Sequence, residues 1–191
     1  MTTLEKRNTV YMAISGLVLF LLSAFCFLFF LTGCSSPTPA PRSLTDQVPH
    51  LALVDEPAIY RGGQPTLAGW QWLRQAGVSN VIKLNQIEEA SDRQAIALGM
   101  TLYYHPIDTL QQLITGPSPA DIDAALTEIT PGTFIHCQHG QDRTGLLVGL
   151  YRITPRSPIS PVWPRDQAWQ EMTNHGFHPA LLGLTKYWQS Q

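Results

Sequence analysis

Residues 133–153 read TFIHCQHGQDRTGLLVGLYRI and contain a short β-prone run, a polar loop and a helical pattern in direct succession. Residues 133–136 predict a short strand, because the run is rich in β-branched and aromatic side chains. Leucines then recur at helical spacing over residues 143–153, so a helix with one buried side is expected there. A buried strand that passes through a tight loop into a helix is typical of an α/β fold.

Alternating strand and helix patterns continue on both sides of this stretch. Short apolar runs predict a strand pair within residues 50–60 and further strands at 78–84 and 101–107, with a loop from 108 to Gly116. The expected helices follow Thr66 and end at Gly77, cover 88–98, begin at Ser118-Pro119, and lie near 166–175 and 179–189. Strands that alternate with helices predict a central, mostly parallel sheet flanked by helices.

The N-terminal part of the chain differs in composition from the rest. Residues 10–31 carry no charge and follow Lys6 and Arg7. At 1.5 Å per residue a helix over this run is about 33 Å long, which is enough to cross a bilayer. Positive charge ahead of an apolar run keeps the N-terminus in the cytoplasm, so the remainder of the chain is expected on the other side of the membrane.

The apolar run ends in Leu31-Thr32-Gly33-Cys34, which resembles the lipobox of bacterial lipoproteins. The resemblance implies that residues 1–33 are a signal peptide and that Cys34 carries a diacylglyceryl group as the mature N-terminus. Ser35 resembles the residue that sends Gram-negative lipoproteins to the outer membrane by default. An uncleaved transmembrane anchor is the alternative, and in both cases the domain is extracytoplasmic and membrane-anchored.

Residues 34–49 contain four prolines and many small polar residues. Such a composition favours an extended spacer over a packed segment. The folded domain is expected to comprise residues 50–191, a normal size for a single domain. Cys137 is the one cysteine in it, so it is either an inert buried thiol or a group kept for chemistry.

The charge balance argues against nucleic-acid binding. Twelve Lys and Arg residues stand against fourteen Asp and Glu residues, which gives a formal net charge of −2. A general DNA or RNA binder needs a basic surface to neutralise phosphates. We therefore expect no nucleic-acid partner.

The loop after residue 136 combines a predicted anion site with a nucleophile. Backbone N–H groups of a tight loop, continued by the N-terminus of the following helix, can bind phosphate oxygens. Gly140 allows the loop to close, and Cys137 stands in the same positive field, which favours its thiolate. Six residues after the cysteine, Arg143 supplies a planar donor for two phosphate oxygens.

The pattern His-Cys-x5-Arg-Thr-Gly over residues 136–145 resembles the signature of cysteine-dependent protein tyrosine phosphatases, and the compact chain resembles their dual-specificity branch. Residues 60–65 and 171–177 are also similar to bacterial members. The resemblance implies attack by Cys137 on phosphorus, a cysteinyl-phosphate intermediate and hydrolysis without metal. It further implies that Thr144 donates a hydrogen bond to the departing sulfur and that His136 supports the loop. The substrate-binding residues would be Gln138, His139, Gly140, Gln141 and Asp142.

Two aspartates compete for the role of general acid, which must protonate the leaving oxygen. Asp108 follows a predicted strand, where the family places its mobile acid, and a helix or turn cap is its alternative role. Asp142 lies in the cysteine loop itself. The sequence Asp-Arg-Thr-Gly resembles a lipid-phosphatase-like bacterial subgroup, which usually has Lys before this aspartate where this chain has Gln141.

Three further features are assigned structural roles. The stretch Trp163-Pro164-Arg165-Asp166 resembles the acid loop of larger tyrosine phosphatases but follows the nucleophile, so Asp166 is expected to be a helix cap. Cys137 and the two histidines beside it lack the spacing of a zinc site, so no metal or cofactor is expected. Arg61 is expected to form structural bonds to backbone or to a carboxylate.

The expected function is metal-independent hydrolysis of phosphate monoesters, with a phosphorylated protein or a small phosphate monoester as the substrate. A phosphoinositide or inositol-phosphate phosphatase is the alternative enzyme, and a catalytically silent phosphate-binding module is the alternative without turnover. The membrane is expected as a partner through the lipid anchor.

Overall fold

The computed structural model describes residues 43–86, 91–155 and 161–191. Residues 42–191 form one compact unit. Its elements in chain order are α2 (Leu44–Gln47), β1 (Ala52–Asp55), β2 (Ile59–Gly62), α3 (Leu67–Gln75), β3 (Asn80–Lys83), α4 (Asp92–Ala97), β4 (Thr101–Tyr104), η1 (Gln111–Thr115), α5 (Pro119–Thr127), β5 (Thr133–His136), α6 (Asp142–Ile153), α7 (Arg165–Asn174) and α8 (Leu182–Gln189).

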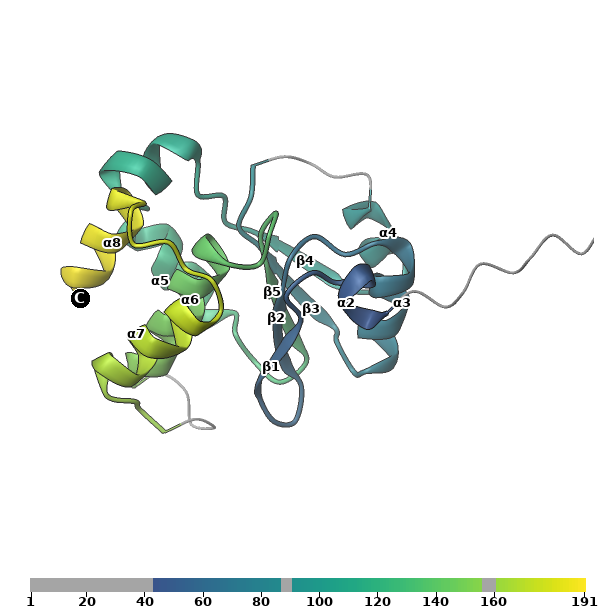
Figure 1. The fold of residues 1–191 in the computed structure, drawn as a ribbon. Coiled ribbons are helices and arrows are strands. Elements are labelled where there is room, and N and C mark those ends of the chain that lie inside the picture. Colours follow the sequence, from purple (N-terminus) through teal and green to yellow (C-terminus); the bar gives the residue numbers. More distant parts are fainter. Residues whose placement is uncertain (1–42, 87–90, 156–160) are drawn as a thin grey trace, which may run out of the picture. The chain divides into compact units, whose positions relative to one another are not determined.

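The five strands form one sheet in the order β1-β2-β5-β3-β4 (Figure 1). β1 and β2 are antiparallel, whereas β2 and β5, β5 and β3, and β3 and β4 pair in parallel. The predicted mostly parallel sheet is therefore confirmed. β5 is the central strand, and its last residue, His136, lies beside Gly62 of β2 and Lys83 of β3. The carboxyl ends of β2, β5 and β3 therefore lie side by side, and the residue after His136 stands at this edge of the sheet.

Helices cover both faces of the sheet (Figure 1). On one face, Trp70 of α3 packs in a hydrophobic cluster with Val81 and Phe134. On the other face, side chains from α5, α6, α7 and α8 pack in a second cluster with Ile82 and Ile135. Consecutive strand residues therefore belong to opposite layers, which is the period of two expected for a sheet buried on both sides.

Most predicted elements are present, with shorter bounds. The helix predicted over 88–98 is α4, which begins at Asp92, and residues 87–90 lie outside the described parts. Gly77 and Gly99 follow α3 and α4 with φ values of +92° and +79°. This left-handed conformation ends helices and suits glycine, so both predicted helix ends are confirmed.

The folded unit begins earlier than the sequence predicted. Ser43 caps the short helix α2 in a capping box. Val48 is fully buried in the cluster that contains Trp70. The hydroxyl of Thr66, at the start of α3, donates to Oε1 of Gln47 over 2.5 Å. Residues 43–49 are therefore part of the domain rather than of the spacer, because an apolar side chain in them completes the core.

The prediction of a loop from 108 to Gly116 is wrong, because this segment contains a helix that ends in the π-helical turn η1. The N–H of Gln111 donates to Oδ1 of Asp108 over 2.7 Å, and the N–H of Asp108 donates to Oε1 of Gln111 over 2.8 Å. This reciprocal pair is a capping box. An aspartate followed three residues later by a glutamine was the local signal for it.

The apolar run 10–31, Cys34 and the spacer up to residue 42 lie outside the described residues, so membrane anchoring stays a prediction. Within residues 43–86, 91–155 and 161–191, no helix is both long and apolar enough to span a bilayer.

Candidate active site

The Cys137 loop, defined as residues 137–141, joins the central strand β5 to the N-terminus of α6. Because β5 is parallel to both neighbouring strands, the loop lies at the carboxyl edge of the sheet. Ligands in open α/β sheets bind at this edge. The first turn of α6 holds Asp142 and Arg143, and N–H groups in the first turn of a helix are available to an anion.

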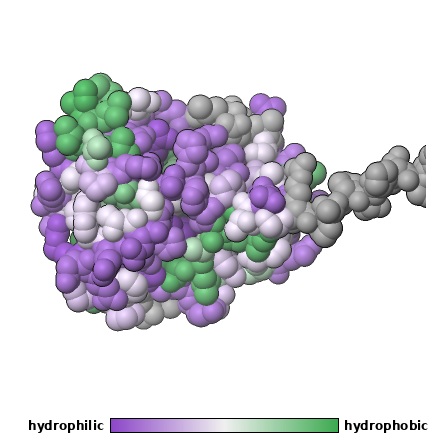
Figure 2. Space-filling model, viewed as in Figure 1, coloured by the Kyte–Doolittle hydropathy of each residue, from purple (hydrophilic) through white to green (hydrophobic). Residues whose placement is uncertain are grey.

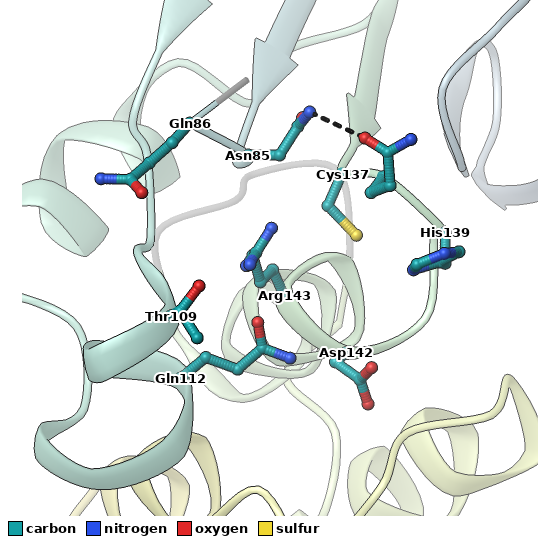
Figure 3. A pocket seen from close by; sticks show the side chains of 9 residues that line it. Asn85, Gln86, Thr109, Gln112, Cys137, His139, Asp142 and Arg143 are labelled. Carbon is teal, nitrogen blue, oxygen red and sulfur yellow. Dashed lines mark hydrogen bonds between the residues drawn. The ribbon is translucent and has the colours of Figure 1, made fainter.

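The sulfur of Cys137 faces a pocket (Figure 3), although only 4% of the residue is exposed. The backbone N–H of Gly140 donates to Sγ over 3.3 Å. A hydrogen bond to the charged form of a group favours that form, so this N–H stabilises a thiolate. The guanidinium of Arg143 lies across the same pocket in this view. A nucleophile and a cation therefore share one cavity.

Gly140 closes the loop for two reasons. Its φ is +79°, a conformation that glycine adopts without a steric penalty. A Cβ at this position would also overlap backbone atoms of Gly62 and Gly63, at the end of β2. The loop thus rests directly on the neighbouring strand.

Arg61 lies beneath the loop and is fully buried. Its Nη2 donates to the carbonyl oxygens of Gly140 and Gln141 over 3.1 Å and 3.5 Å. Burial lowers the pKa of Arg61 to about 10, while the negative charges of Glu171 and Cys137 act in the opposite direction. The guanidinium is therefore charged at neutral pH and attracts the Cys137 thiolate. Its bonds to backbone carbonyls confirm the structural role expected from the sequence.

Residues on both sides of β2 hold the outer part of the loop. Nδ1 of His50 lies 2.8 Å from the carbonyl oxygen of His139. The N–H of Gln64 donates to the carbonyl oxygen of Gln138 over 3.1 Å. The carbonyl groups of Gln138, His139 and Gly140 thus each bond to a residue that precedes them by more than seventy positions in the chain. The loop conformation is set by tertiary contacts as well as by its own sequence.

The ring of His136 is fully buried among aromatic side chains. It stacks on Phe134 with centroids 5.4 Å apart and meets the ring of Trp70 edge-on at 5.6 Å. Neither ring nitrogen has a hydrogen-bond partner in the described parts of the chain. Burial lowers the pKa of His136 to about 4, with Asp92 acting against this effect and Lys83 adding to it. His136 is therefore neutral and contacts its surroundings through packing.

The bond from Thr144 to the departing sulfur, which the family resemblance implies for the reaction, stays a prediction. The side chain of Thr144 is fully buried, and among the described residues its hydroxyl has no partner. In this structure the sulfur of Cys137 accepts from the N–H of Gly140, a residue in a left-handed conformation.

The pocket has a volume of about 260 Å³. This is below the roughly 300–1,000 Å³ of sites that enclose drug-sized ligands, so it suits a phosphoryl group and the first atoms of its substituent. The described lining residues are Asn85, Gln86, Thr109, Gln112, Cys137, Gln138, His139, Asp142 and Arg143 (Figure 3).

Five of the predicted site residues thus line one pocket, and the others lie outside its described lining. The side chain of Gln141 lies against Gly176. Gly140 belongs to the loop itself, and the side chains of His136 and Thr144 are buried beside it. Sequence reasoning missed four lining residues, for which no local motif exists: Asn85, Gln86, Thr109 and Gln112.

The two candidate acids have different surroundings. Asp142 lines the pocket, and its Oδ1 accepts a hydrogen bond from the backbone N–H of His178 over 2.8 Å and lies 2.9 Å from Nδ1 of the same residue. Asp108 is not part of the described lining, but the next residue, Thr109, is. One oxygen of Asp108 accepts from the N–H of Gln111, as described above. Asp108 therefore does have the capping role that was its alternative assignment.

The acid-loop-like stretch near residue 163 has a structural role. The ring of Trp163 stacks on the guanidinium of Arg152, 4.1 Å from the ring centroid. α7 begins at Arg165 with Pro164 as its N-cap, so Asp166 lies in the first turn and is not the cap that the sequence predicted. Within the described ranges, no three His, Cys, Asp or Glu side chains are placed to hold a metal ion.

A family model described as "DSP-PTPase phosphatase fused to NAD+ Kinase" matches residues 43–176, which is well over half of the chain. The match begins at Ser43, the residue that caps α2. No protein with a curated function matches the sequence.

Solved structures with the same fold have low sequence identity to this chain. The catalytic core of the PP-IP phosphatase Siw14 from S. cerevisiae, in complex with citrate, is 19% identical, with a TM-score of 0.60 over 73% of this chain and 83% of that one. P. aeruginosa TpbA is 20% identical, with a TM-score of 0.61 over 81% and 93%. A TpbA variant in complex with pTyr is 19% identical, with a TM-score of 0.59 over 81% and 91%. These similarities establish the fold.

Proposed function

Because the chain belongs to the DSP-PTPase phosphatase family, it is a cysteine-dependent phosphatase that hydrolyses phosphate monoesters without metal, and we propose that Cys137 is its nucleophile, Arg143 its phosphate clamp and Asp108 its general acid. One observation supports the roles of Cys137 and Arg143. The Gly140 N–H and the Arg143 guanidinium converge on the pocket that the Cys137 sulfur faces.

In the first step, the Cys137 thiolate attacks phosphorus, an S–P bond forms, and the P–O bond to the leaving group breaks. The leaving oxygen takes the proton of Asp108. Arg143 and the N–H groups of the Cys137 loop hold the three remaining oxygens, which carry the transferred charge in the transition state. The products of this step are a free alcohol or phenol and a cysteinyl phosphate.

In the second step, a water molecule attacks phosphorus and the S–P bond breaks. The Asp108 carboxylate accepts the proton of the water, so the acid is ready for the next cycle. Inorganic phosphate leaves, and the returning thiolate is stabilised by the Gly140 N–H and by the buried Arg61 cation.

Asp108 suits the acid role better than Asp142 does. Both the backbone N–H and the ring of His178 contact a single oxygen of Asp142, so this side chain is held in place by two tertiary contacts. The Oδ1 atom of Asp108 accepts a single hydrogen bond, from the backbone N–H of Gln111. The next residue in the chain, Thr109, lines the pocket. A group that must alternate between protonated and ionised forms is better served by the weaker set of contacts.

We further propose that the enzyme acts outside the cytoplasm while anchored to a membrane through a lipid on Cys34. The support is the lipobox-like sequence that ends at Cys34 and the uncharged run before it. The substrate is then a phosphorylated protein or a small phosphate monoester in that compartment. Cys34→Ala should move the protein from the membrane fraction to the soluble fraction, or leave it with an uncleaved anchor and no lipid.

The experiment that tests the nucleophile is Cys137→Ser, assayed with phenyl phosphate. We expect turnover to be abolished while orthovanadate, a phosphate analogue, still binds, because the loop amides and Arg143 remain. Full activity in the variant would refute the role of Cys137. A wild-type protein that binds vanadate but hydrolyses none of several monoesters would instead be a silent phosphate-binding module.

A further inference from the structure

The wall of the pocket facing Cys137 is made of uncharged polar side chains. Asn85 and Gln86 follow β3, whereas Thr109 and Gln112 belong to the helix that ends in η1. Figure 3 shows Gln86, Thr109 and Gln112 on the side of the pocket opposite to Cys137 and His139. Gln138 adds a further amide, which accepts a hydrogen bond from Nδ2 of Asn85 over 3.4 Å. A substituent attached to the bound phosphate therefore meets amide and hydroxyl groups.

The wall opposite Cys137 offers an aromatic substituent no aromatic or aliphatic side chain among the described lining residues. Aromatic ligands bind mainly to apolar and aromatic walls, where they bury their faces. Among the lining residues that the structure describes, none is aliphatic, and the one aromatic ring is the imidazole of His139, which lies on the Cys137 side of the pocket. Leu110, Leu113 and Ile114, which neighbour Thr109 and Gln112 in sequence, are between 45% and 61% exposed and are not part of this lining.

The described lining also offers one permanent cation, Arg143, which the first phosphoryl group occupies. A second phosphate would need a further Lys or Arg, and Asp142 would repel it. Two other cations near the site are already engaged. Arg61 is buried under the loop carbonyls, and Lys83 forms a buried ion pair with Asp92.

We propose that the substrate is the monophosphate of a neutral polyhydroxylated alcohol, such as a sugar or polyol phosphate, and that Gln112 and Gln86 are specificity-determining residues. This inference rests on the proposed function of the same site. Hydroxyl groups can both donate to amide oxygens and accept from amide nitrogens, so a polyol matches this wall without leaving buried groups unpaired. A phenol has no ring hydroxyl groups to pair with these amides, and a polyphosphate finds no second cation among the described lining residues.

The test compares kcat/KM of the purified full-length chain for glucose 6-phosphate, phosphotyrosine and fructose 1,6-bisphosphate. We expect glucose 6-phosphate to be preferred over each of the other two by about tenfold or more, which corresponds to one or two well-made hydrogen bonds. Phosphotyrosine has the better leaving group, so a preference against it must come from binding interactions.

The variant Gln112→Leu replaces an amide by an apolar group of similar size. It should lower the ratio of kcat/KM for glucose 6-phosphate to that for phosphotyrosine by about tenfold, and Gln86→Leu should act in the same direction. Gln71→Leu is the matched control, because Gln71 is an exposed residue of α3 outside the pocket lining, and it should leave the ratio unchanged.

The outcomes separate this inference from the proposed function. Cys137-dependent hydrolysis with no preference for glucose 6-phosphate, or a ratio unaffected by Gln112→Leu and Gln86→Leu, would overturn the inference and leave the phosphatase assignment intact. Preference for fructose 1,6-bisphosphate or for a phosphoserine peptide would overturn it in the same way. Failure to hydrolyse any monoester, phenyl phosphate included, would refute both.

Discussion

The Cys137 loop and the segment that carries Asp108 contribute to the same reaction but are held in different ways. The loop rests on β2 at Gly62, is bonded from below by Arg61 and is tied at its outer side to His50. The Asp108 segment is stabilised by a capping box between residues three apart. Figure 2 shows hydrophobic side chains exposed at the upper left, the region of the helix that ends in η1 in Figure 1.

This difference separates two functions physically. The part that binds phosphate is built into the centre of the sheet, where displacement of one residue disturbs several long-range contacts. The part that delivers the proton depends on local bonds near the surface. Changes in the first region should therefore affect binding, catalysis and folding together, whereas changes in the second should affect proton transfer alone.

With the nucleophile Cys137 left in place, the largest effect is expected from Asp108→Asn. The amide oxygen still accepts the Gln111 N–H, so the melting temperature should stay close to the wild-type value. Without a proton to donate, kcat for an alkyl phosphate should fall by about 10²- to 10⁴-fold, and kcat for an activated aryl phosphate should fall far less. Steady-state kinetics with the two substrates measures this difference.

Two controls sharpen the result. Gln111→Ala removes one half of the capping box and leaves the carboxyl group, so a comparable rate loss there would assign Asp108 to capping alone. Asp142→Asn removes the rival acid. A larger loss in that variant would transfer the acid role to Asp142.

The next effect is expected from Gly140→Ala, which breaks the contact between the Cys137 loop and β2. The added Cβ would overlap Gly62 and Gly63, so the loop must shift, and a displacement of about 1 Å in a catalytic site can cost about 10²-fold in rate. Gly99→Ala is the matched control. Its φ is the same, +79°, but a Cβ there meets nothing within 4 Å. Equal losses of activity in the two variants would show that the overlap has no special role.

The smallest effect on activity is expected from His136→Gln. This variant should instead change how the free energy of unfolding depends on pH. The folded-state pKa of His136, about 4, lies below the ordinary value of 6.5, so the unfolded chain binds the extra proton first as the pH falls. The contribution of His136 to stability is therefore complete above pH 6.5 and is lost as the pH falls from 6.5 to about 4.

Urea unfolding of wild type and His136→Gln between pH 4 and pH 7 tests this. Burial also lowers the pKa of His175, so the wild-type slope contains a second contribution, and His175→Gln measures it. The slope should flatten more in His136→Gln than in His175→Gln. A slope unchanged by His136→Gln would show that His136 is protonated in the fold or has no part in the pH dependence.

The sequence by itself determined the strand, loop and helix around Cys137, and with them the fold class and the chemistry. These features depend on short-range signals: a β-prone run, a glycine at a tight turn, leucines at helical spacing, and a cysteine six residues before an arginine. The capping box at Asp108 was equally local, and its pattern of aspartate and glutamine was present in the sequence.

Only the tertiary structure decided which residues surround that loop. Arg61 lies under Gly140 because β2 pairs with β5, and Gln112 faces Cys137 because the chain crosses the sheet edge after β4. The burial of Val48, which moved the domain boundary, likewise depends on the space beside Trp70. Such contacts join residues far apart in the chain, and no local pattern encodes them, since they follow from strand order and packing.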